Sequence, residues 1–174
     1  KDYNFHRLYK ELLNFCSLDL SSFYFDIRKD VLYCDSANSK KRKECVKILN
    51  IILDCLLRWF APIFVFTTEE IYSLVSKDTM SIHEYEFPKI PKQWENQNLN
   101  DKWKELFKIK QEANIAIEAK RASKEIGSSL EAEIKITTSN KNFELLEGLD
   151  LAEYFITSKA EKFRNVSKEE TKVE

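Results

Sequence analysis

Residues 39–72 read SKKRKECVKILNIILDCLLRWFAPIFVFTTEEIY and give the strongest structural signal in this chain of 174 residues. From residue 45 to residue 60 nearly every side chain is apolar, and the exceptions recur every three or four positions: Lys47, Asn50, Asp54 and Arg58. At 3.6 residues per turn, these exceptions form one narrow stripe along a helix. A helix that is apolar over the rest of its circumference must be covered by other helices or by lipid. Asp54 and Arg58 would be costly inside a bilayer, so we expect the central helix of a bundle.

The residues that follow predict a turn and a second helix. Pro62 cannot continue a helical hydrogen-bond ladder, so the central helix should end or kink there. Thr67-Thr68-Glu69-Glu70 has the pattern of a capping box, which predicts a helix from Thr67 to about Val75. The two glutamates could also be considered as a pair for acid–base chemistry. Neighbouring helical residues point about 100° apart, so capping is the favoured interpretation.

The rest of the chain supplies further helices and a different C-terminal part. Apolar residues at helical spacing predict one helix over residues 3–16 and another over 23–32, with Asp19, Ser21 or Ser22 as a cap between them. With the central helix and residues 67–75, these form an antiparallel helical bundle over residues 1–75. We expect residues 76–100 to be an extended connection held by its aromatic side chains, Tyr85, Phe87 and Trp94.

The C-terminal half predicts a long helix and then a small mixed unit. Residues 101–127 should complete the bundle, with Gly127 just past the end of the helix. In residues 128–174, apolar residues alternate over 131–138 and again over 154–163, with a short helical pattern between. We expect a strand–helix–strand unit with a parallel strand pair. The predicted fold class is therefore mainly α, an antiparallel helix bundle with a small C-terminal α/β appendage.

Composition excludes several classes of site. The net charge is −1, so no overall basic field attracts nucleic acid, although residues 1–60 carry 11 Lys or Arg against 8 Asp or Glu. Only two glycines occur, which argues against a glycine-rich phosphate loop. The four cysteines show no C-x-x-C spacing, so we expect no zinc site. Their apolar surroundings favour buried free thiols in a reducing, cytoplasmic compartment.

Two basic groups are candidates for binding an anion. Lys40, Lys41, Arg42 and Lys43 would crowd the first turn of the central helix if Ser39 is its N-cap, where the helix dipole favours anions. Free amide groups and cations at a helix start suit a phosphate. His6, Arg7 and Lys10 form a second group. From composition alone, solvated helix surface is the favoured interpretation of both groups. The alternatives for Trp94 are a wedge against the bundle and an exposed stacking residue.

Three motifs resemble those of a known family. APIFVFTTEEIY, residues 61–72, is similar to the A-P-x-x-P-F-T-x-E-E-x-W signature of the anticodon-binding domain in class I valyl-, leucyl- and isoleucyl-tRNA synthetases. Val65 stands where a second proline is usual, and Tyr72 where tryptophan is usual. The NFC–DLSSFY–D–KD–LYCD pattern of residues 3–35 and RASKEIGSSLEAEI, residues 121–134, resemble bacterial-type isoleucyl-tRNA synthetases. Together the motifs span nearly the whole chain in the order of that family.

The resemblance implies the C-terminal anticodon-binding region of an isoleucine–tRNA ligase, with isoleucine tRNA, through its anticodon stem-loop, and the remaining synthetase domains as partners. The H-I-G-H and K-M-S-K-S motifs of the catalytic domain do not occur in this sequence, so this part should be non-catalytic and without a cofactor. ATP with magnesium, and zinc in a module that follows this region in many bacterial enzymes, would belong to the parent enzyme. Arg121 and Lys124 join the candidate tRNA contacts.

A second hypothesis is a helical protein-interaction module that makes no RNA contact. The chain begins almost directly within a predicted helix, so the bundle could lack one helix and expose an apolar groove. Such grooves recruit partner helices or dimerise, and this interpretation predicts that the 174-residue chain self-associates. Neither hypothesis involves a membrane.

Overall fold

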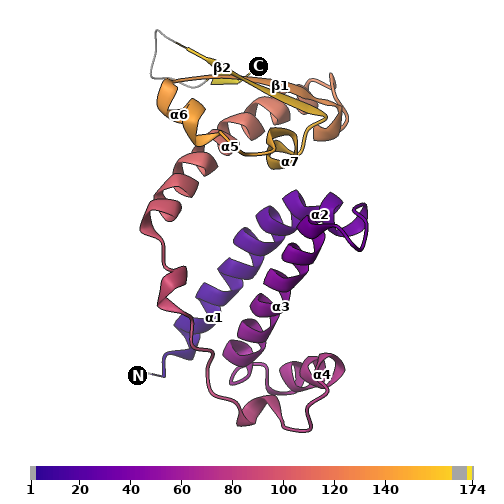
Figure 1. Ribbon diagram of the computed structural model, residues 1–174, viewed down its shortest axis with the longest axis vertical. Helices are drawn as coiled ribbons and strands as arrows, with labels where there is room; N and C mark the ends of the chain where they lie inside the picture. The colour runs from indigo at the N-terminus through magenta and orange to yellow at the C-terminus, as the bar shows by residue number, and fades with distance from the viewer. Residues whose placement is uncertain (1–2, 166–171, 174) are drawn as a thin grey trace. The chain divides into compact units, whose positions relative to one another are not determined.

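The computed structural model describes residues 3–165 and 172–173, and it divides into two compact units, Lys1–Pro91 and Lys92–Glu174. The first unit is helical, whereas the second joins a long helix to a three-stranded sheet (Figure 1). The predicted fold class, mainly α with a small C-terminal α/β part, is therefore confirmed. In the described part of the chain, no helix is long and apolar enough to span a bilayer.

The first unit begins with one uninterrupted helical segment where we predicted two helices. α1 (Phe5–Asn14) continues through a π-helical stretch, η1 (Phe15–Phe25), into α2 (Asp26–Tyr33), and the backbone stays right-handed helical at both junctions. Ser22 does not cap a new helix, because its hydroxyl donates to the Ser17 carbonyl five residues back, at 2.8 Å. The predicted break was wrong because this serine is satisfied inside the helix.

α3 (Lys40–Phe60) is the predicted central helix, and it runs antiparallel to the first segment. Ser39 is its N-cap as predicted, since the Ser39 hydroxyl accepts the Arg42 amide at 3.4 Å. The helix ends two residues before Pro62. The Tyr24 hydroxyl lies 3.5 Å from the Cys45 sulfur near the start of α3, while the rings of Tyr9 and Phe64 are 6.0 Å apart beyond its end. These contacts fix the antiparallel arrangement seen in Figure 1.

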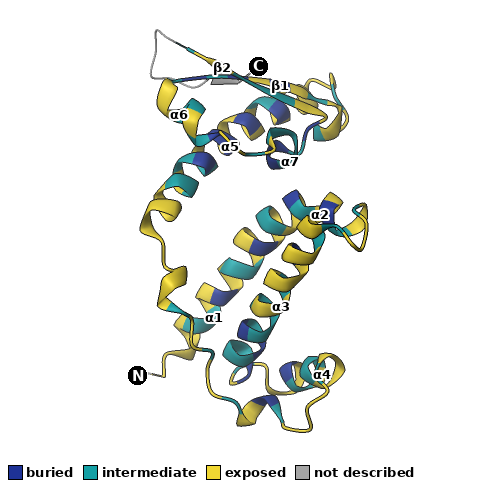
Figure 2. Cartoon of the chain, viewed as in Figure 1, coloured by how far each residue is buried: buried dark blue, intermediate teal, exposed yellow. Residues whose placement is uncertain are grey.

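The apolar circumference of α3 is covered only in part within the first unit. Cys45, Cys55 and Leu57 are buried, as predicted for the central helix. Three other apolar side chains expected in the core are exposed: Val46, Ile48 and Ile51. Figure 2 shows exposed residues along much of α3. The first helical segment, α4 and residues 76–91 pack against parts of this helix, where we had expected it to be surrounded.

α4 (Val65–Val75) begins two residues earlier than predicted and uses no capping box. Phe64 precedes it without a side-chain cap. Thr68 is buried, and its hydroxyl donates to the Phe64 carbonyl at 2.9 Å. The Phe60 carbonyl accepts the amides of both Ile63 and Phe64 at 2.8 Å, so the tight turn at Phe60 leads directly into α4.

Residues 76–91 fold back onto α3 and α4, with only the short 3₁₀ helix η2 (Ile82–Glu84). Ile82 is 1% exposed and joins Leu57 and Ala61 in a buried cluster. The rings of Tyr72 and Tyr85 lie 5.7 Å apart, which confirms Tyr85 as an anchor, whereas Phe87 is exposed. The Tyr85 hydroxyl donates to the Asp78 carboxylate. This hydrogen bond lowers the pKa of Asp78 and raises the pKa of Tyr85.

The second unit contains the predicted parallel strand pair. β1 (Glu133–Thr138) and β2 (Lys159–Arg164) are parallel, with Ile134 opposite Ala160 and Ile136 opposite Lys162. A third strand that we did not predict, β3 (Lys172–Val173), pairs antiparallel with β1, giving the order β2-β1-β3. Two short helices, α6 (Asn140–Leu145) and α7 (Leu151–Phe155), join β1 to β2. The predicted strand over residues 154–158 was therefore wrong.

The long helix α5 (Gln97–Ala122) packs against this sheet, after a short 3₁₀ helix η3 (Lys92–Trp94) (Figure 1). Its buried side recurs at helical spacing and meets buried residues of the sheet and α7: Leu106, Ile109, Ala113, Ile117, Ile134, Ile136 and Phe155. Lys110 is also buried, and its ammonium donates to the Tyr154 carbonyl. α5 forms one compact unit with the sheet, and its predicted packing on the helical bundle stays a prediction.

Candidate nucleic-acid interface

The four cations at the start of α3, here called the basic turn (residues 40–43), differ in how firmly they are held. The Arg42 guanidinium donates to the Asp35 carbonyl at 2.9 Å, so Arg42 closes the loop before the helix. The Lys43 ammonium donates to the Asn38 side chain at 3.2 Å, and Lys40 lies 3.8 Å from the Glu44 carboxylate. Lys40, Lys41 and Lys43 are exposed. Three exposed ammonium groups at a helix start, where the helix dipole favours anions, can receive a phosphate.

His6, Arg7 and Lys10, here called the N-terminal basic group, lie on the first turns of α1 at the opposite end of the first unit. All three are exposed, and the Asn4 side chain caps the helix by accepting the Arg7 amide at 3.1 Å. α3 has 21 residues, so its length separates this group from the basic turn by about 30 Å. The sequence placed both groups among the candidates, and the structure puts them at opposite ends of the first unit.

Arg121 and Lys124 are brought together at the C-terminal end of α5. They line one hollow of about 500 Å³ with Glu118, Ala122, Ile126 and Gly127. The Arg121 guanidinium contacts the Glu118 carboxylate at 2.7 Å. Lys124 adopts φ 61°, the left-handed conformation that we expected Gly127 to supply at the helix end. The Gly127 amide instead donates to Glu131 at 2.8 Å.

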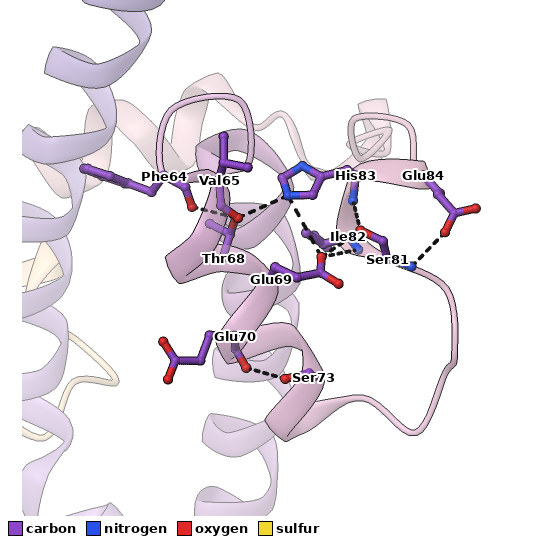
Figure 3. A network of polar contacts seen from close by, with 10 residues as sticks. All are labelled: Phe64, Val65, Thr68, Glu69, Glu70, Ser73, Ser81, Ile82, His83 and Glu84. Carbon is purple, nitrogen blue, oxygen red and sulfur yellow. Dashed lines mark hydrogen bonds and ion pairs between the residues drawn. The ribbon is translucent and has the colours of Figure 1, made fainter.

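A polar network around Glu69 joins α4 to residues 81–84 (Figure 3). One Glu69 carboxylate oxygen accepts the Ser81 hydroxyl at 2.7 Å and the Ile82 amide at 3.0 Å. His83 lies 3.1 Å from the Val65 carbonyl through its Nε2 atom and 4.0 Å from Glu69. The neighbouring Glu70 carboxylate is exposed and points away from this network (Figure 3). Glu69 therefore positions the connection, and the two glutamates do not form a catalytic pair.

Sequence reasoning missed a hollow at the N-terminal end of α5. It has a volume of about 670 Å³ and is lined by Trp94, Glu95, Asn96, Gln97, Leu99, Asn100 and Trp103. Trp94 is 53% exposed, so it is not buried within the second unit, and its role as a wedge against the bundle or as a stacking residue stays a prediction. The signal available in the sequence was the run of tryptophan and amide side chains in WENQNLNDKW, which we had divided between a connection and a helix.

The cysteines give no indication of metal or redox chemistry. All four are free thiols, and Cys45 and Cys55 are buried as predicted, whereas Cys34 is exposed and Cys16 half-buried. Burial raises the pKa of the Cys16 and Cys55 thiols, which keeps them protonated near neutral pH. Among the described residues, no cluster of three His, Cys, Asp or Glu side chains could hold a metal ion.

Comparison with known proteins gives one family. The family model described as "Anticodon-binding domain of tRNA ligase" matches residues 1–136. The chain is 58% identical over 160 residues to an isoleucine–tRNA ligase of Pelagibacter ubique (strain HTCC1062), a match that covers 92% of the chain and 18% of the relative. Isoleucine–tRNA ligases of Mesorhizobium japonicum and Agrobacterium fabrum are 41% and 40% identical, each over 157 residues, which is 90% of the chain and 16% of each relative. The chain thus spans less than a fifth of the length of these relatives.

Proposed function

The chain belongs to the anticodon-binding domain family of tRNA ligases, and we propose that it is the part of an isoleucine–tRNA ligase that holds the anticodon stem-loop of isoleucine tRNA. The observation that carries this proposal is the 58% identity to an isoleucine–tRNA ligase over 92% of the chain. The parent would be a cytoplasmic enzyme that uses ATP and magnesium in parts outside these 174 residues. Zinc, where the parent has it, would likewise lie outside them.

In this proposal the chain positions the tRNA and does not react with it. Binding of the anticodon end orients the acceptor end of the tRNA at a distant catalytic centre. Such orientation lowers the entropic part of the activation barrier for aminoacylation. The stem would be held through phosphates and 2′-hydroxyl groups, while unpaired loop bases are available for stacking and hydrogen bonding. The exposed lysines of the basic turn, the N-terminal basic group, and the hollow of Arg121 and Lys124 are the proposed contacts.

Charge reversal at the basic turn tests the proposed contacts. Lys40→Glu with Lys43→Glu removes two exposed cations and leaves Arg42 in place to hold the Asp35 carbonyl. We expect weaker binding of a labelled isoleucine anticodon stem-loop and a salt slope reduced by about one for each phosphate that a lysine no longer neutralises. Lys77→Glu with Lys89→Glu is the control, since it makes the same change in net charge at two other exposed lysines of the first unit. Equal effects of the two double variants would remove the basic turn from the interface.

The distance between the two basic groups gives a further test of the same proposal. They lie about 30 Å apart, far beyond the separation at which substitutions usually couple. Lys10→Glu combined with the Lys40/Lys43 reversal should therefore weaken stem-loop binding by the sum of the separate effects on the free energy. A coupling above about 0.5 kcal/mol would show that the two groups do not act as separate contacts.

The second candidate function, a protein-interaction module, is favoured by one observation on α4. Phe66 is 88% exposed and Leu74 79% exposed, and Val65 and Val75 are exposed on the same short helix. Figure 2 shows that much of α4 is exposed. This module could join the remaining synthetase domains or a second copy of the chain. Sedimentation at increasing concentration distinguishes these options, because self-association through α4 should be reduced by Phe66→Ser. A wild-type chain that stays monomeric excludes the second copy.

A further inference from the structure

The hollow at the N-terminal end of α5, here called the tryptophan hollow, takes no part in the cationic contacts proposed above. We propose that it receives one unpaired nucleobase of the bound RNA, an inference that rests on the proposed function. Its volume of about 670 Å³ and its lining of two indoles, three carboxamides, one leucine and one carboxylate carry the argument.

The aromatic side chains provide a surface for stacking. More than half of the Trp94 side chain is exposed, so a large apolar ring is available without any rearrangement of the core. Trp103 is held in place, because its ring lies 6.2 Å from Phe107 and 6.0 Å from Tyr154. Unpaired bases bind to proteins mainly by stacking on such rings, whatever their sequence. The hollow thus combines an accessible indole with a fixed one.

The carboxamides provide a group that can read a base edge. The Asn96 side chain accepts the Leu99 amide at 3.0 Å, and the Gln97 side chain donates to Asp101 at 2.9 Å, so both are engaged. The Asn100 carboxamide has no hydrogen-bond partner among residues 3–165 and 172–173. It presents one donor group and one acceptor, the combination that pairs with the edge of a base.

The charge of the lining selects a base over a phosphate. Glu95 is the only ionised side chain among the seven that line the tryptophan hollow. A phosphate would meet a carboxylate there and no cation, whereas Arg121 and Lys124 line the hollow at the C-terminal end of α5. A neutral ring avoids this repulsion, and its exocyclic amino group can donate to the Glu95 carboxylate. The two hollows therefore differ in the part of a nucleotide that each suits.

Two RNAs and four variants of the 174-residue chain test the proposal. The RNAs are the isoleucine anticodon stem-loop and a blunt duplex of the same stem without unpaired bases. Trp94→Ala should weaken stem-loop binding about 5- to 150-fold and leave duplex binding within about twofold. Trp94→Phe should retain most of the affinity, because a phenyl ring still stacks. Asn100→Ala should cost about 2- to 12-fold, the range for one hydrogen bond.

Phe163→Ala is the matched control, since it removes another exposed aromatic ring from the second unit and should change neither affinity. Unchanged stem-loop binding by Trp94→Ala, or an equal loss for stem-loop and duplex, would overturn the base site and leave the proposed function standing. A wild-type chain that binds neither RNA at low salt would overturn both. Circular dichroism checks the fold of each variant. If Trp94→Ala unfolds, the base site is tested by Asn100→Ala, and unchanged stem-loop binding by that variant would overturn it.

Discussion

Replacing Glu69 by alanine should release residues 76–91 from α4 while leaving the second unit intact. The Glu69 carboxylate accepts two hydrogen bonds, from the Ser81 hydroxyl at 2.7 Å and from the Ile82 amide at 3.0 Å (Figure 3). The Ile82 amide belongs to a residue that is 1% exposed, so without Glu69 it loses its acceptor in a place that water reaches poorly. Such a loss is more costly than the deletion of a surface hydrogen bond.

The expected size of the effect follows from these two contacts. A hydrogen bond to a charged group contributes about 1.5–3 kcal/mol when it is buried. The Glu69 side chain is 41% exposed, so water screens it, and we take the range for a single bond as the total for both bonds together. A loss of about 1.5–3 kcal/mol corresponds to an increase of about 10- to 150-fold in the opening equilibrium of the segment. Glu69→Gln should lie between alanine and wild type, because an amide oxygen still accepts.

Hydrogen exchange followed by mass spectrometry measures this opening locally. Peptides that cover residues 77–87 should exchange faster in Glu69→Ala, whereas peptides from β1 should be unchanged. Glu70→Ala is the matched control, since Glu70 is one residue away, has the same chemistry and points away from the network (Figure 3). We expect the control to alter stability by less than about 0.5 kcal/mol. Equal exchange in the two variants, or uniformly faster exchange in both units, would refute the role given to Glu69.

Two further predictions concern stability. Leu106 of α5 is fully buried, so Leu106→Ala should destabilise the second unit by about 2–5 kcal/mol, measured as a lower urea midpoint by tryptophan fluorescence; an unchanged midpoint would contradict the described core. Burial, together with the hydrogen bond to Cys45, raises the pKa of Tyr24 from 10.0 to about 12. The unfolded chain loses this proton first, so the stabilising contribution is complete below about pH 10 and is lost as the pH rises towards 12. Tyr24→Phe should reduce the alkaline loss of stability in urea titrations at pH 9 and pH 11.5, and an identical loss would exclude Tyr24 as its source.

Local signals determined much of the fold. Ser39 was identified as a cap and Pro62 as a stop because each acts on the backbone within a few residues, and α3 has the predicted bounds. The alternation around Ile134 and Ile136 predicted β1 for the same reason. Where a local signal had two uses, the prediction was wrong. Ser22 could cap a helix or bond back within one, and Thr68 could belong to a capping box or be buried, and in both cases the folded chain has the second arrangement.

The sequence by itself determined the family, the helical nature of the first unit and the types of residue available to bind RNA. Only the tertiary structure placed the basic turn about 30 Å from the N-terminal basic group, because the antiparallel packing of two long helical segments puts their starts at opposite ends. The tertiary structure also assigned Glu69 to Ser81 and Ile82 and opened the tryptophan hollow beside Asn100. These features depend on which surfaces come into contact after the chain folds back on itself. The spacing of residues along a single helix or strand does not determine those contacts.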